Sequence, residues 1–133
     1  EMSTCILGSG KDAYVYSTVE YTLPDGQDID LFTKQVKING NHRMMLAKLD
    51  EARRQAMEEQ ALYIHRLMGL RDISRIDWRY EPQQDQAYFI EVTPLPELSE
   101  GTEFHWTAKH NHQPYSYVFS EIIRSAASRY GLV

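Results

Sequence analysis

Cysteine is nearly absent from this sequence: one residue of 133, Cys5, carries a thiol. No disulfide can therefore form within the chain. Because Cys5 lies inside an apolar run, we expect a small buried side chain and a reducing compartment, which favours a cytoplasmic location. Long apolar runs are lacking too. None approaches the roughly 20 residues that cross a bilayer, so no membrane role is indicated.

An excess of positive charge is also lacking. The chain has 14 Lys and Arg against 19 Asp and Glu, interleaved along its length, for a net charge of −5. The broad positive field that drives binding to a phosphate backbone is missing, and nucleic acid is not an expected partner.

Repeats, low-complexity tracts and Pro/Gly/Ser-rich linkers are not visible, so we predict a single domain over residues 1–133. Its composition, 42% hydrophobic and 25% charged, is typical of a globular domain. The first residues already have strand character and carry no initiator methionine or signal-peptide features. We therefore expect a segment excised from a longer protein.

What is present is a succession of β-prone and helical patterns. The runs "STCILG" and "AYVYSTVEYT" flank the turn formers "SGKD" and predict a hairpin, and "IDLFTKQVK" predicts a short strand. Apolar residues at three- and four-residue steps predict a long amphipathic helix from Asn41 to about Met68, with Gly69 as its C-terminal cap. Another helix is expected over roughly Tyr115 to Tyr130.

Between the two predicted helices, residues 74–92 read as two alternating runs around a polar connector, which predicts a second hairpin. Two β segments, a helix, a hairpin and a helix predict an α+β fold, with an antiparallel sheet and helices packed on one face. The proline-rich stretch "TPLPELSEGTEF" is expected to be a loop.

Two like charges face each other in this second hairpin. If the strands close at Tyr80 and Tyr88, Asp77 lies across from Glu91, on a face that also carries Arg75. Directly opposed like charges destabilise a sheet, so the pair needs compensation. Three explanations are open: neutralisation by flanking arginines, a proton shared by the carboxylates, or a divalent cation such as Mg²⁺.

The same register divides the other residues of the hairpin between two faces. Arg79, Phe89 and Thr93 are predicted to lie on the charged face. The opposite face is predicted to hold the core residues Ile76, Trp78, Tyr80, Tyr88, Ile90 and Val92.

The loop after Glu91, "EVTPLPELSEG", joins two prolines to the small residues Ser99 and Gly101. A stiff turn followed by small residues lets the backbone approach an anion closely. A carboxylate pair, an arginine and this loop at one end of a hairpin suit the transfer of a phosphoryl or acyl-phosphate group.

These residues have a counterpart in a known family. "GLRDISRIDWRY" followed by "AYFIEVTPLPELSEG" resembles the C-terminal metal-binding segment of ATP-grasp ligases, most closely the D-alanine–D-alanine ligases. There an R-x-D strand precedes an E-x-N strand and a proline-containing loop. The resemblance implies an ATP-dependent carboxylate–amine ligase, in which ATP phosphorylates a carboxylate and an amine attacks the acyl phosphate.

The resemblance also implies roles for the hairpin residues. Asp77 and Glu91 match the family's ligands for Mg²⁺ (or Mn²⁺), and Arg75 matches the arginine that stabilises the acyl phosphate. Thr93 stands where the family has a metal-binding asparagine, and Glu97 where it has a glycine. These two departures also allow a non-catalytic relic of the fold, serving as a binding or assembly module.

Other matches lie outside the hairpin. Ser99, Gly101 and Thr102 fall in the loop that holds the second substrate's carboxylate in the ligases. Glu1 falls where a glutamate bonds the ribose of ATP, and Lys34 matches a lysine that contacts phosphate.

The resemblance covers only the second half of the ATP-grasp clamp. It implies ATP and small carboxylate or amino-acid substrates as partners, together with an N-terminal half that this chain lacks. The isolated chain is therefore expected to be inactive, and homo-oligomerisation is left open. An unrelated α+β interaction domain with a surface ion network is the remaining alternative. The tract "HWTAKHNH" is interpreted as a loop or the start of a helix rather than a zinc site.

Overall fold

The computed structural model describes residues 1–29, 33, 35–36 and 39–133. One antiparallel sheet has the strand order β3-β2-β1-β4-β5. Its strands are β1 (Met2–Leu7), β2 (Tyr14–Thr22), β3 (Arg43–Leu46), β4 (Ile73–Glu81) and β5 (Gln86–Thr93). The helices are the 3₁₀ turn η1 (Gly10–Asp12), α2 (Glu51–Leu67), α3 (Glu103–His110) and α4 (Ser116–Arg129). Both predicted hairpins are confirmed, as β1–β2 and β4–β5.

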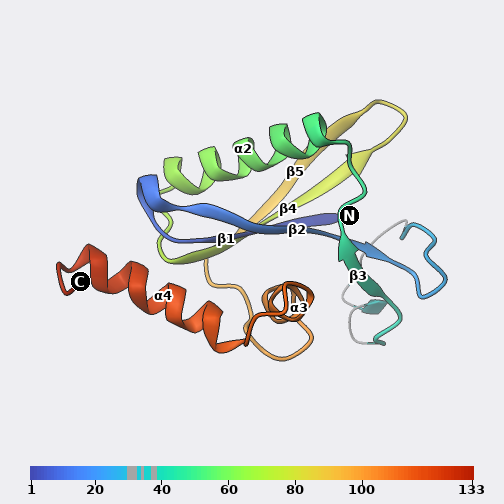
Figure 1. Ribbon diagram of the computed structural model, residues 1–133. Helices are drawn as coiled ribbons and strands as arrows, with labels where there is room; N and C mark the ends of the chain where they lie inside the picture. The colour runs from blue at the N-terminus through green and yellow to red at the C-terminus, as the bar shows by residue number, and fades with distance from the viewer. Residues whose placement is uncertain (30–32, 34, 37–38) are drawn as a thin grey trace.

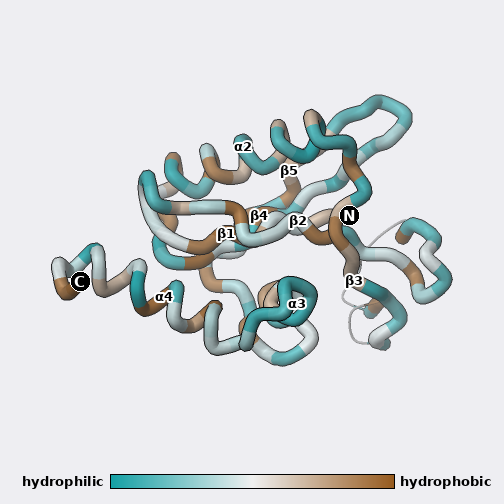
Figure 2. The backbone as a smooth tube through the Cα atoms, viewed as in Figure 1, coloured by the Kyte–Doolittle hydropathy of each residue, from teal (hydrophilic) through white to brown (hydrophobic). Residues whose placement is uncertain are grey.

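Helices cover both faces of the sheet, with α2 on one side and α3 and α4 on the other (Figure 1). The α+β class and the antiparallel sheet are confirmed, but the predicted packing on one face is wrong. The reason lies in β1, where all six residues are buried. Met2 and Ile6 join the core beneath α2, whereas Cys5 and Leu7 pack against α3 and α4. In Figure 2 the hydrophobic colour accordingly gathers in the central strands.

The first long helix is shorter than predicted. It begins at Glu51 rather than Asn41, because the Asp50 carboxylate caps it by accepting the Arg53 N–H at 2.8 Å. The ten preceding residues instead supply β3, an edge strand paired with the end of β2. No helix in the described part of the chain combines the length and apolarity needed to cross a membrane.

The predicted cap at the other end of α2 is confirmed. Gly69 has a φ of 62°, and its N–H donates to the Arg66 carbonyl at 3.0 Å. The Leu70 N–H reaches the His65 carbonyl, also at 3.0 Å. These two bonds form a Schellman motif, which turns the chain sharply into β4.

The second hairpin has the predicted register only as far as the charged pair. Asp77 lies opposite Glu91, but a β-bulge follows, and Trp78 then pairs with Phe89. Ile90 is the extra residue. The faces predicted for Phe89, Tyr88 and Ile90 are therefore wrong: the ring of Phe89 packs on Trp78, with centroids 6.1 Å apart, and Ile90 is exposed and lines a cavity with Asp77 and Glu91. A bulge of this kind commonly redirects side chains next to a functional site.

The C-terminal region contains one helix that was predicted and one that was not. α4 confirms the helix expected near Tyr115–Tyr130. α3 lies where the sequence predicts the end of the proline-rich loop and a loop or the start of a helix, because eight residues carry little periodic signal. Phe104 and Ala108, one turn apart, bury its inner side against β1. The strand predicted for "IDLFTKQVK" falls largely outside the described residues.

Candidate functional site

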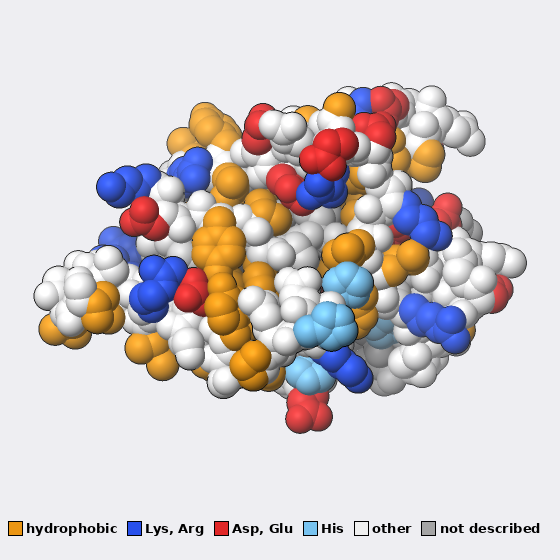
Figure 3. Space-filling model, viewed as in Figure 1, with side chains coloured by type: hydrophobic (Ala, Val, Ile, Leu, Met, Phe, Trp, Pro, Cys, Tyr) orange, Lys and Arg blue, Asp and Glu red, His pale blue; other side chains and the backbone are white. Residues whose placement is uncertain are grey.

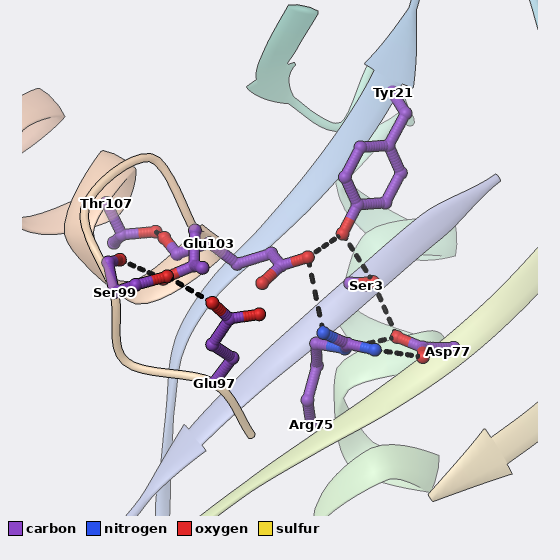
Figure 4. A network of polar contacts seen from close by, with 9 residues as sticks. Ser3, Tyr21, Arg75, Asp77, Glu97, Ser99, Glu103 and Thr107 are labelled. Atoms are coloured by element: carbon purple, nitrogen blue, oxygen red, sulfur yellow. Dashed lines mark hydrogen bonds and ion pairs between the residues drawn. The ribbon is translucent and has the colours of Figure 1, made fainter. Parts of the chain in front are cut away.

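The charged face of β4 is directed toward the start of α3. Arg75 on β4 lies between Asp77 and Glu103, the first residue of α3 (Figure 4). Its guanidinium donates two hydrogen bonds of 2.8 Å to the Asp77 carboxylate, from Nε to Oδ1 and from Nη2 to Oδ2. Nη1 is 3.3 Å from Oε1 of Glu103. The Arg75 side chain is only 12% exposed. Arg75 therefore neutralises one member of the carboxylate pair and is held in a fixed position.

Glu103 was not identified from the sequence. It is the first residue of α3, where a negative charge interacts favourably with the helix dipole, and it accepts a hydrogen bond from the Tyr21 hydroxyl. An acidic residue just after Thr102, the N-cap, is a recognisable helix-start signal. That signal marks the helix, but the contact with Arg75 depends on the tertiary fold.

Ser3 on β1 completes the polar network. Its hydroxyl donates to Oδ1 of Asp77 at 2.5 Å and lies 3.0 Å from the hydroxyl oxygen of Tyr21. Close polar contacts thus link Asp77 through Ser3 and Tyr21 to Glu103, with hydrogen bonds to the carboxylate at each end (Figure 4). Such a network fixes the orientation of every side chain in it.

Burial and charge set the protonation states of this network. Burial raises the pKa of Tyr21, and the negative charge of Glu103 raises it further, so the phenol stays neutral and can donate. Burial alone would lower the pKa of Arg75. The hydrogen bonds to Asp77 and the charge of Glu103 outweigh that effect, and the pKa is raised. The site therefore contains a permanent cation.

Asp77 and Glu91 line a common cavity of about 230 Å³. Glu91 is exposed and has no hydrogen bond or ion pair in the described part of the chain. The opposed charges are thus relieved in two ways: Arg75 neutralises Asp77, and water solvates Glu91. Of the three explanations for the pair, neutralisation by an arginine operates for Asp77.

The same donor set also fits a divalent cation. Three of the roughly four lone-pair positions of the Asp77 carboxylate hold donors, which leaves one for a metal beside the unpaired Glu91. Thr93, opposite Arg75, shares the face of Glu91. The described residues offer no cluster of three or more His, Cys, Asp or Glu that could hold a metal. Water and phosphate oxygens would complete the shell, as is usual for Mg²⁺.

The loop residues meet Arg75 at a second cavity, of about 240 Å³, which Arg75, Gly101 and Thr102 help to line. Gly101 has a φ of 87°, and its N–H donates to Nδ1 of His105 at 3.0 Å. This contact gives His105 a structural role. Ser99 lies outside the lining residues and donates from its hydroxyl to the carboxylate of Glu97.

The two predicted nucleotide contacts differ in outcome. Glu1 lines the same cavity as Asp77 and Glu91, so the fold brings it to the carboxylate pair. Lys34 lies outside the described residues. Tyr21, which the sequence does not predict, lines both cavities.

The model of the "D-ala D-ala ligase C-terminus" family matches residues 1–124. The chain belongs to this family. A D-alanine–D-alanine ligase of Methylocella silvestris is 30% identical over 103 residues, which make up 75% of this chain and 32% of that protein. D-alanine–D-alanine ligase B of Clostridium tetani is 25% identical over 89 residues, covering 66% of this chain and 25% of the relative. The resemblance found in the sequence is confirmed.

Solved structures of such ligases have the same fold. The D-alanine–D-alanine ligase from Bacillus anthracis complexed with ATP superposes with a TM-score of 0.69 at 16% identity, over 96% of this chain and 38% of that one. VanG D-Ala:D-Ser ligase from Enterococcus faecalis gives 0.66 at 19% identity, over 93% and 35%. The family member described here thus spans about a quarter to two fifths of the length of these proteins.

Proposed function

We propose that this chain is the C-terminal portion of an ATP-dependent carboxylate–amine ligase. The observation that carries the proposal is the Asp77–Glu91 pair, which lines a cavity beside Arg75, an arginine held in place by Asp77 itself and by Glu103. Membership of the ligase family supports the same reaction class. A buried free thiol at Cys5 supports a reducing, cytoplasmic setting.

Asp77 and Glu91, with Thr93 beside them, would hold Mg²⁺ or Mn²⁺. A bound divalent ion would supply positive charge to the phosphate oxygens of ATP during transfer. The chain's own contribution is to hold both carboxylates on one face of a rigid hairpin. The bulge at Ile90 turns the strand just beyond them.

Arg75 would stabilise the negative charge of the acyl phosphate. Its 3.3 Å contact with Glu103 is its longest bond, so Nη1 is the atom best placed to exchange Glu103 for a phosphate oxygen. Gly101 and Thr102 line the cavity on that side and would position the second substrate's carboxylate, with Ser99 supporting the loop.

ATP would need more than this chain provides. Glu1 and Lys34 would contribute contacts, and the remaining ones would come from the N-terminal half of a complete ligase. Because nucleotide positioning supplies much of the rate in phosphoryl transfer, we expect these 133 residues alone to show no ATP turnover.

A non-catalytic relic is the second candidate, and specific contacts favour it. The guanidinium of Arg75 already forms ion pairs with Asp77 and Glu103. Glu97 adds another negative charge to the lining of the adjacent cavity. In a relic these groups would only stabilise the fold. The two candidates differ in whether the pair at Asp77 and Glu91 binds a metal.

Metal binding can be tested with Glu91→Gln. This residue is exposed and has no partner among the described residues, so the change removes a ligand without disturbing the network, whereas Asp77→Asn would also release Arg75. Mn²⁺ added to the ¹⁵N-labelled chain should broaden the amide signals of Asp77 and Glu91 first. Glu91→Gln should raise the Mn²⁺ concentration needed by at least about fivefold.

The matched control is Glu59→Gln, an exposed carboxylate on α2, which should leave the titration unchanged. Broadening spread evenly over the acidic surface, or equal titrations for Glu91→Gln and the unmodified chain, would reject the metal site and favour the relic.

A further inference from the structure

A cleft of about 430 Å³ lies at the other end of β1, away from the carboxylate pair. The β1–β2 connection and the C-terminal parts of α2 and α4 form its walls. Its lining includes five cations, Lys11, Arg66, Arg71, Arg124 and Arg129. Figure 3 shows Lys and Arg side chains gathered at this end of the molecule. In a chain with a net charge of −5, this concentration of positive charge is unexpected.

Arg66 is held in place without being neutralised. Its Nε donates to the Gly10 carbonyl at 3.0 Å and its Nη2 to the Ala13 carbonyl at 3.2 Å. Both acceptors are uncharged, so the guanidinium is oriented and keeps its full charge. An oriented arginine loses less conformational freedom when it binds an anion.

Carboxylates balance only part of the remaining charge. Arg129 pairs with Asp72 at 2.5 Å and Arg124 with Glu121 at 2.6 Å. Lys11 and Arg71 form no ion pair within the described part of the chain. Among the described lining residues, Asp12 is the only acidic one. The cleft therefore keeps an excess of positive charge.

Hydrogen bonds between distant segments make the floor of the cleft rigid. The Ser9 hydroxyl donates to the Asp72 carboxylate at 3.0 Å and accepts the Asp72 N–H at 2.9 Å. Ser125 on α4 lies 3.0 Å from the same hydroxyl, oxygen to oxygen. Segments more than 50 residues apart are thus fixed to one another before any ligand arrives.

Helix stabilisation accounts for only some of these cations. Basic residues in the last turn of a helix interact well with its dipole, which explains Arg66 and Arg129. Lys11 lies in η1 and Arg71 in the connection to β4, so the dipole does not explain them. Their convergence on the cleft points to an anionic ligand.

We propose that this cleft binds the phosphate group of a small phosphorylated molecule. Guanidinium groups match the geometry of phosphate oxygens and can donate two parallel hydrogen bonds. The volume lies within the range of small-molecule sites. This site shares no lining residue with the cavities beside Arg75, so it is separate from the proposed ligase chemistry.

The test is a titration of the ¹⁵N-labelled chain with sodium pyrophosphate and inorganic phosphate, in low salt with EDTA present. Saturable shifts are expected at the amides of residues 8–12 and of Arg71. Arg71→Gln and Arg66→Gln should each weaken binding by about fivefold to tenfold. Arg43→Gln, an exposed arginine on β3, is the matched control and should bind as tightly as the unmodified chain.

Arg71→Gln removes an exposed side chain that forms no ion pair with any described residue, so its effect on binding can be measured without a change in folding. Equal affinities for all variants, or shifts confined to residues around Arg75, would overturn the proposal. A hexaglutamate peptide that binds the cleft more tightly than pyrophosphate would also overturn it, because the ligand would then be an acidic protein segment.

Discussion

The hydroxyl of Tyr21 connects the two ends of the polar network, since it donates to Glu103 and lies 3.0 Å from Ser3. Tyr21→Phe removes this donor while keeping the ring. The buried carboxylate of Glu103 then loses a partner, and we expect the free energy of unfolding to fall by about 1–3 kcal/mol.

Urea titration followed by circular dichroism measures this loss. Tyr88→Phe is the control, because Tyr88 is exposed and its hydroxyl bonds, among the described residues, only to Gln84. It should change stability by less than about 0.5 kcal/mol. Equal effects of the two substitutions would mean that the Tyr21 hydroxyl adds nothing to the network.

At the scale of single residues, the sequence reveals contacts within a hairpin but not those across the fold. Regular alternation closed at Tyr80 and Tyr88 predicts Asp77 opposite Glu91, and the pair is observed although Tyr80 in fact pairs with Ala87, because the extra residue Ile90 restores the register. Glu103 contacts Arg75, 28 positions away, and Tyr21, 82 positions away. No local pattern links residues so far apart, so the partner that completes the arginine site could not be predicted.

At the scale of elements, two glycines allow a direct comparison. Gly8 follows β1 with a φ of 94°, and a Cβ there would lie 2.7 Å from the Asp12 carbonyl oxygen. Gly69 ends α2 with a φ of 62°, and nothing lies within 4 Å of its Cβ position. Gly69→Ala should therefore cost only the backbone strain, about 1 kcal/mol.

Gly8→Ala should cost more, about 2–4 kcal/mol, because a backbone atom must also move. Thermal unfolding of the two variants side by side checks the order. A Gly69→Ala variant less stable than Gly8→Ala would contradict it, and would mean that the β1–β2 connection adjusts more readily than the end of the helix.

The elements that sequence reasoning missed share a physical cause. The methionines and leucine of β3 fit a helical period as well as an edge strand, and the open edge of β2 decides between them. The bulge at Ile90 leaves no mark in a regular alternation. α3 is too short for periodicity to be clear. Tertiary contacts override local preference in the first case and supply the missing information in the others.

For the molecule as a whole, His65 should make stability depend on pH. It is fully buried, its Nδ1 lies 2.7 Å from the Ser74 hydroxyl oxygen, and burial lowers its pKa below the ordinary value of 6.5. The unfolded chain therefore binds a proton near pH 6.5 more readily than the folded chain. Stability is fully present above pH 6.5 and is lost as the pH falls toward the folded pKa.

Urea titrations at pH 7.5 and 5.5 should show a lower free energy of unfolding at pH 5.5. In His65→Gln the difference between the two pH values should be smaller, whatever the stability of this variant at pH 7.5. His112→Asn, at an exposed position with a φ of 55°, is the control and should keep the full pH dependence. If His65→Gln lost as much unfolding free energy between pH 7.5 and 5.5 as the unmodified chain, the pH dependence of stability would belong to other groups.

The position of β1 has a consequence for solvent exchange. It is hydrogen-bonded to β2 and β4, and helices cover both of its faces. Its backbone amides can therefore meet deuterated water only when the whole domain opens, whereas amides in the β4–β5 turn can exchange through local fluctuations. The slowest protons in the molecule would thus report its global stability without denaturant. Each destabilising substitution above would appear as faster exchange of the same few protons in one strand.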